Sequence, residues 1–278
     1  MCESPMPAYK SRPFLDPDKP VWRYLSLDAA IATIRDQKLR LTRVDMFPDP
    51  FEGSVPKKQI DGQTTIFSGN ESIRMMMTQV TAHYPGMSMP PRDDEDSWTR
   101  MTRLRRAKTR SAHASCWSEG DESESLWRLY CEDDSARGLG VALRTTLDRL
   151  EKSVEIYDLY VSPVTYRRYH EGDGFTDELD SFMHKRTGFS AEREVRLLKV
   201  DNIQYNALIQ RPPTAPELPE HMYLDWIVGD AIEEIVLSPY ADEAYESRAR
   251  AAIAAADPTL TVPVILSELN PRRYQPGF

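Results

Sequence analysis

Short stretches in which apolar and polar residues alternate are spread along the whole chain, and each predicts a β-strand. Leu39 and Leu41, for example, alternate with Arg40 and Thr42. On this basis we expect strands at residues 21–26, 39–44, 111–118, 138–144, 154–166, 192–200, 223–229, 233–238 and 261–269.

Apolar residues at helical spacing predict helices between these strands. Ile31 and Ile34 belong to one apolar stripe, and either Ser26 or Asp28 is suited to cap that helix, which should run to about Gln37. Further helices are expected at 70–84, 95–112, 124–131, 176–186 and 242–256, and proline-rich loops at 47–53 and 211–221. Because strands and helices interleave without a regular βαβ rhythm, the pattern favours an α+β fold with a mixed sheet.

The pattern also indicates how the chain is organised. Residues 1–20 carry five prolines and are expected to form an extended arm. Residues 21–278 show no internal repeat and no clean linker, so we expect one domain, with a helical insertion at about 70–112.

Composition is typical of a soluble globular protein: 40% of the 278 residues are apolar and 28% are charged. The net charge of -9 argues against a protein that coats DNA or an anionic membrane, although it leaves room for a local basic groove. No run approaches the roughly 20 apolar residues that span a bilayer, and the N-terminus lacks the apolar core of a signal peptide. We therefore expect a cytoplasmic protein without a membrane partner.

Several kinds of site are disfavoured. The three cysteines include no C-x-x-C pair, and no two of the five histidines have the spacing of metal ligands, so no metal site is expected. Neither a P-loop nor a G-x-G-x-x-G motif occurs. Cys116 is a candidate nucleophile, but a lone cysteine is more often a small buried apolar residue.

Two clusters allow both a functional and a structural reading. The run "RMTRLRRAKTR" (100–110) holds six basic residues, which either grip phosphates or form a solvated helix face. Trp127 and Tyr130 lie three positions apart on one expected helix, where they form either an aromatic wall for a flat ring or part of the core.

The most unusual feature is the pair Glu192 and Glu194 in "EREVRLLKV" (192–200). On a strand these carboxylates and Arg196 would share one face, where like charges repel. A surface ion pair with a neighbouring arginine is one explanation, and a functional carboxylate pair is the other.

Four motifs, taken in order, resemble those of the bacterial domain-of-unknown-function family 2971, which has ADP-ribosyltransferase-like features. They are "VWRYLS" (21–26), "PDPFE" (48–52), "CWSE" with "LWRLY" (116–119 and 126–130), and "EREVR" (192–196). Pro48, Cys116 and Arg128 depart from the family pattern, which expects asparagine, serine and serine there. Whether these departures mean an altered or an inactive site stays open.

The resemblance implies a mainly antiparallel split sheet with flanking helices and an activity that uses NAD as substrate. Glu194 would be the catalytic glutamate, and Glu192 would orient or deprotonate the acceptor. Arg23 would bind a phosphate or ribose of NAD, with Tyr24 shaping that wall, and Ser118 or Ser115 would support Glu194 and the nicotinamide ribose. The acceptor would be a nucleic acid or a protein, and the setting a toxin in phage defence or a toxin–antitoxin pair, with an antitoxin or chaperone as partner.

This chemistry gives two adjacent carboxylates a use. Cleavage of the nicotinamide–ribose bond develops positive charge on the sugar, which a fixed carboxylate stabilises, while a second carboxylate acts as general base. Two other hypotheses stay open: a non-catalytic module that binds a nucleotide or a partner, and a metal-dependent nuclease that uses acidic runs such as "DDED" (93–96).

Overall fold

One mixed, mostly antiparallel sheet organises the described part of this computed structural model, which comprises residues 16–54, 97–133, 136–168, 179–209 and 218–274. The main path through the sheet is β11-β2-β3-β1-β6-β12-β13, and β10 joins β3 and β7. The strands of this sheet are β1 (Pro20–Leu25), β2 (Lys38–Arg43), β3 (Ala112–Glu119), β6 (Val141–Thr146), β7 (Tyr160–Pro163), β10 (Glu194–Val200), β11 (His221–Asp225), β12 (Glu234–Leu237) and β13 (Val264–Leu266).

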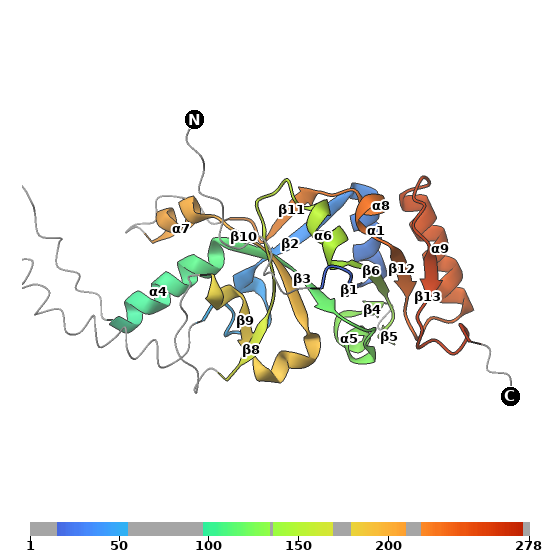
Figure 1. Ribbon diagram of the computed structural model, residues 1–278, viewed down its shortest axis with the longest axis horizontal. Helices are drawn as coiled ribbons and strands as arrows, with labels where there is room; N and C mark the ends of the chain where they lie inside the picture. The colour runs from blue at the N-terminus through green and yellow to red at the C-terminus, as the bar shows by residue number, and fades with distance from the viewer. Residues whose placement is uncertain (1–15, 55–96, 134–135, 169–178, 210–217, 275–278) are drawn as a thin grey trace, which may run out of the picture.

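Helices and two short ribbons surround the sheet. The helices are α1 (Leu27–Asp36), α4 (Ser97–Arg110), α5 (Glu124–Tyr130), α6 (Leu147–Ser153), α7 (Asn202–Leu208), α8 (Val228–Ala231) and α9 (Glu243–Ala256), with 3-10 turns η1 (Val44–Met46), η2 (Asp180–Phe182) and η3 (Thr187–Glu192). The ribbons pair β4 (Glu132–Asp133) with β5 (Ala136–Arg137) and β8 (Thr165–Arg167) with β9 (His184–Arg186). Along the longest axis, α4 and α7 lie at one end and α9 at the other (Figure 1).

The central strand β3 is where the sheet splits. One edge of β3 pairs with β10 over its length, from Glu194↔Ser118 to Val200↔Ala112. The other edge is shared, because β2 pairs with residues 113–114 and β1 with residues 118–119. Between these two contacts, β1 and β2 separate.

Strand alternation divides the apolar side chains between the two faces of the sheet. One face carries the main core, to which β1 contributes Val21 and Leu25 and β3 contributes Trp117. On the opposite face, Trp22 and Tyr24 belong to a smaller cluster with α5, and Ala112 and Ala114 to another. Successive strand side chains point to opposite faces, so residues 116 and 118 of β3 lie between these two smaller clusters.

The predicted α+β class, the mixed sheet and most elements are confirmed. Ser26 is the N-cap of α1, since its hydroxyl accepts from the Ala29 amide, and Gln37 ends that helix in the left-handed conformation. The predicted helix at 70–84 and most of the predicted N-terminal arm lie outside the described residues, whereas α4 occupies 97–110 of the helix predicted at 95–112.

Other predictions were wrong where apolar runs are short. Of the strand predicted over 154–166, only β7 and β8 form; the helix predicted over 176–186 contains the turn η2 and the strand β9; and the strand predicted over 223–229 ends at Asp225, before α8. Helices α6 and α7 were not predicted. Periodicity over so few residues does not separate buried strands from helical turns, and tertiary packing decides between them.

Candidate functional site

The pairing of β3 with β10 places four polar side chains on one face of the sheet. Glu194 lies opposite Ser118, and Arg196 lies opposite Cys116. Directly opposed residues of an antiparallel pair project to the same side, so the four side chains are neighbours. Ser118, Glu194 and Arg196 are buried, and Arg196 has no exposed surface.

Glu192 also lies beside these side chains, but it belongs to a turn and not to the expected strand. The strand begins only at Glu194, and Glu192 is the last residue of the 3-10 turn η3, so the alternation argument was wrong for this residue. Arg193, between them, has a left-handed backbone with φ of 43°. The Ser118 hydroxyl donates to the Glu192 carbonyl at 2.7 Å, which fixes the turn against β3.

A buried network of ion pairs joins three carboxylates to two cations: Glu52, Glu192 and Glu194 with Lys185 and Arg196. Arg196 donates to both carboxylate oxygens of Glu52, at 2.8 and 2.7 Å, and to Glu194 Oε1 at 2.5 Å. Lys185 Nζ lies 2.6 Å from Glu192 Oε2 and 3.2 Å from Glu194 Oε2. The five side chains are therefore well paired, and their formal charges leave one negative charge in excess.

The network keeps Glu194 ionised. Burial by itself would raise the pKa of its carboxyl, but Arg196 and then Lys185 outweigh burial and lower the pKa to about 2. The Cys116 thiol behaves oppositely, because burial and then Glu194 raise its pKa well above the usual range. Cys116 is thus a neutral thiol close to Glu194, which counts against the nucleophile hypothesis.

Two tyrosine hydroxyls border the carboxylates. Tyr166 accepts a hydrogen bond from the Glu194 amide at 2.8 Å, and burial raises the pKa of Tyr166 to about 12. Tyr130 lies close enough to Glu192 for their charges to interact, and it is 49% exposed, so it borders the network on its outer side. Burial and then Glu192 raise the pKa of Tyr130, which remains a neutral donor.

Arg23 lies where β1 separates from β2. Its Nη2 donates to the Arg40 carbonyl at 2.9 Å, and its guanidinium carbon lies 5.9 Å from the centroid of the Trp117 ring. Among the described residues, no carboxylate lies within ion-pairing distance of Arg23. Burial and then the nearby charge of Arg40 lower the pKa of Arg23 to about 10, and the Cys116 thiol is close enough to contribute.

The remaining predicted site residues are parts of the two cores. Ser115 belongs to the opposite face of β3 from Ser118, where its hydroxyl accepts from Trp117 Nε1 at 3.2 Å. Trp127 is fully buried beneath Tyr24, with ring centroids 5.0 Å apart. Of the expected aromatic wall, only Tyr130 borders the carboxylates.

The departures from the family pattern have different consequences. Cys116 borders the network, because it lies opposite Arg196 in the β3–β10 pairing and close to Glu194. Arg128 faces away on α5, where it pairs with Glu124 at 2.9 Å and lies 4.8 Å from the centroid of the Tyr240 ring. Pro48 opens the loop that carries Glu52.

Several residues of the site were not identified from the sequence. Glu52 lay inside the recognised "PDPFE" motif, and "HKR" (184–186) supplies both Lys185 and Arg186. Arg186 pairs with Asp49 of the same motif, through Nε at 3.2 Å and Nη2 at 2.8 Å. The available signal was the acidic residue inside a recognised motif, because a glutamate that becomes buried needs a cationic partner such as Arg196.

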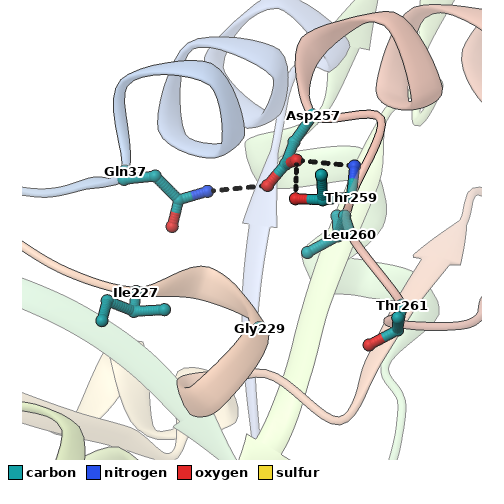
Figure 2. Close-up of a pocket in the computed structure, with 7 residues that line it drawn as sticks. All are labelled: Gln37, Ile227, Gly229, Asp257, Thr259, Leu260 and Thr261. Carbon is teal, nitrogen blue, oxygen red and sulfur yellow. Dashed lines mark hydrogen bonds between the residues drawn. The ribbon is translucent and has the colours of Figure 1, made fainter.

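A separate pocket of about 360 Å³ lies beside the C-terminal end of α1, lined by residues including Gln37 and Asp257. Figure 2 shows these two side chains bonded to each other, at 3.2 Å, and Asp257 bonded to Thr259. The polar groups there satisfy one another, and none belongs to the carboxylate network, so we assign this pocket no role.

Other kinds of site find no support in the described ranges. They contain no group of three or more histidine, cysteine, aspartate or glutamate side chains suited to a metal ion, and their helices are too short or too polar to cross a membrane. No protein-family model matches this chain, and neither a curated protein nor a solved structure matches it.

Proposed function

We propose that this protein is an NAD-dependent ADP-ribosyltransferase, which transfers ADP-ribose from NAD to a nucleic acid or a protein. The observation that carries the proposal is the buried, ionised carboxylate of Glu194, which Arg196 and Lys185 hold in place. Such a fixed anion suits a substrate whose sugar becomes cationic. Arg23 has no carboxylate partner among the described residues and lies on the opposite face of the sheet, with Val21, Leu25 and Trp117, where β1 and β2 separate.

Glu194 would act on the nicotinamide ribose. As the bond from C1′ to nicotinamide breaks, both electrons leave with the neutral nicotinamide, and C1′ becomes cationic. The carboxylate is already ionised and held by Arg196 and Lys185, so it would stabilise that charge without reorganising. The negative charge in excess within the network favours the same cation.

Glu192 would act on the acceptor. Its carboxylate would take the proton that the attacking oxygen or nitrogen loses as it bonds to C1′. Ser118 would be a positioning residue, because its hydroxyl holds the Glu192 carbonyl. Arg23 would bind a phosphate of NAD, and Ser115 would orient the Trp117 ring against which Arg23 lies. Tyr24 and Trp127 pack against each other on the other face of the sheet, where they would support α5 and its Tyr130.

Nicotinamide release from NAD, followed by mass spectrometry with cell extract as the acceptor source, tests the proposal. Glu194→Gln should lower the release about 100- to 1000-fold, the usual effect of removing one charge-stabilising group. Glu192→Gln should lower transfer to an acceptor more than it lowers bond cleavage, because the general base acts on the acceptor. No release by the unmodified protein would contradict the proposal.

A matched variant separates chemistry from folding. Glu234 begins β12 and pairs with Arg144 at 2.6 Å, so Glu234→Gln removes a paired glutamate of the same sheet away from the network. It should leave nicotinamide release unchanged. Thermal unfolding of all three variants shows whether a loss of activity follows a loss of structure, and activity retained in a folded Glu194→Gln variant would refute the assigned role.

One observation favours a second candidate, a non-catalytic module that binds a nucleotide or partner. Both proposed catalytic carboxylates are already ion-paired, and neither side chain is more than 10% exposed. A purely structural network would look similar. Calorimetry distinguishes the two, because this module would bind NAD or a related nucleotide without releasing nicotinamide.

The family resemblance suggests a setting for the activity: a bacterial toxin inside the cytoplasm, in phage defence or a toxin–antitoxin pair, restrained by an antitoxin or chaperone. Expression in a bacterial host tests this part. The unmodified protein should arrest growth, whereas Glu194→Gln should be harmless at equal abundance.

A further inference from the structure

The rim of the carboxylate network carries an arginine between two phenylalanine rings. The Arg186 guanidinium carbon lies 4.5 Å from the Phe51 ring centroid and 5.3 Å from that of Phe189. Asp49, whose side chain is 3% exposed, accepts hydrogen bonds from Nε and Nη2 of Arg186. Arg186 itself is 39% exposed, and Nη1 has no hydrogen-bond acceptor within the described residues.

Two further arginines extend this cationic surface along α4. Arg105 donates to the backbone carbonyls of Pro50 and Glu52, so it flanks the loop that presents Phe51. Arg106 follows it, and both side chains are exposed. Neither pairs with a carboxylate in the described ranges. Arg106 also lies at i,i+4 to Arg110, which pairs with Asp45 at 3.3 Å, so Arg106 is the cation of this helical turn that keeps no carboxylate partner in the described ranges.

We call Phe51, Arg105, Arg106, Arg186 and Phe189 the arginine–phenylalanine rim. It borders the proposed catalytic groups directly, because Lys185 Nζ lies 4.8 Å from the Phe189 ring centroid and also bonds Glu192 and Glu194. From β9, which carries Arg186, α4 leads toward the end of the molecule (Figure 1). Arg105 and Arg186 therefore both adjoin the loop that carries Phe51, and Arg106 follows Arg105 on α4.

We propose that the arginine–phenylalanine rim binds single-stranded nucleic acid and that the acceptor is a nucleotide of that strand. A base would stack on the Phe51 ring, which is 43% exposed, while guanidinium groups contact successive phosphates. An exposed phenylalanine beside two exposed arginines without a carboxylate partner in the described ranges, Arg105 and Arg106, fits a polyanion with flat bases better than it fits a protein surface. The proposal deepens the proposed function and rests on it for the transfer step.

Fluorescence anisotropy with a labelled single-stranded oligonucleotide, without NAD, tests the binding. Three exposed guanidinium groups predict a slope of about -2 for the logarithm of affinity against the logarithm of salt concentration. Phe51→Ala should weaken binding about 5- to 100-fold, the range for one stacked base. Arg106→Gln should reduce the salt slope by about 0.7, the contribution of one phosphate contact.

Matched variants lie elsewhere on the molecule. Tyr274, 58% exposed beside Arg273, is an exposed aromatic next to an arginine, and Arg137 is an exposed arginine on β5. Tyr274→Ala and Arg137→Gln should leave both the affinity and the salt slope unchanged.

The inference would be overturned if the oligonucleotide did not bind at low salt. It would also be overturned if a duplex bound as tightly as the single strand and Phe51→Ala had no effect on either affinity. The third contrary result is ADP-ribose found only on protein acceptors. Nicotinamide release by the unmodified protein without oligonucleotide tests the proposed function separately. Nicotinamide release without oligonucleotide binding would refute this inference alone. Oligonucleotide binding without nicotinamide release would refute the proposed function.

Discussion

Glu52 and Arg196 form a bidentate ion pair although 144 positions separate them in the chain, and their side chains are 3% and 0% exposed. The pair ties the loop before residue 54 to the strand that carries Glu194. Removing two charges from water costs several kcal/mol for each, and that cost is offset only while the pair is intact. The loop therefore holds its place through this contact.

Glu52→Gln should lower the free energy of unfolding by about 3–5 kcal/mol, because Arg196 would keep its buried charge and lose a full counter-charge. Urea denaturation measures the change. Glu234→Gln is the control: its pair with Arg144 is about 30% exposed on both sides, so the loss should stay below about 1 kcal/mol. Equal losses in the two variants would contradict a special role for Glu52.

Stability should depend on pH through Glu194. The folded-state pKa of about 2 lies below the usual value of 4.5, so the contribution is complete above about pH 4.5 and is lost as pH falls toward 2. It amounts to about 3 kcal/mol. Unfolding measured from pH 7 to pH 2 should show the unmodified protein and Glu194→Gln converging at acid pH, and a constant difference between them would refute the prediction.

Arg23→Met should leave the free energy of unfolding unchanged or raise it by up to about 2 kcal/mol, because it removes a desolvated cation without a carboxylate partner and keeps the packing on Trp117. NAD binding should weaken in the same variant by 10-fold or more, the usual cost of a lost charged hydrogen bond. Thermal unfolding and calorimetry measure the two effects. A clear loss of stability would show that Arg23 serves the fold.

Gly53 has a φ of 65°, and a Cβ added there would lie 2.5 Å from Thr109 Cγ2. Gly53→Ala should destabilise the protein by more than about 1 kcal/mol, through backbone strain and through the clash with α4. Adding Thr109→Ser removes the clashing methyl group and should recover part of the loss, as a double-mutant cycle would show. Gly188→Ala, with no atom within 4 Å of the added Cβ, should have little effect.

Local sequence patterns were enough to predict the element types and several site residues. Alternation over residues 39–44 and the cap at Ser26 concern neighbours in the chain, so β2 and α1 followed from them. The motifs that contain Glu52, Ser118, Tyr130 and Glu194 were recognised as distinctive, and these residues do lie together. Composition and charge, in contrast, excluded classes of protein without locating any site.

The tertiary structure decided which of those residues meet and in what state. Whether Ser115 or Ser118 faces Glu194 depends on the register of β3 against β10, and no short window of sequence contains that pairing. Glu192 ends a 3-10 turn and is not part of the strand, and its carbonyl accepts from the Ser118 hydroxyl, 74 positions away in the chain. Burial, ion pairing and the pKa of Glu194 likewise arise from long-range contacts, which local periodicity does not encode because it reports only which face of its own element a residue occupies.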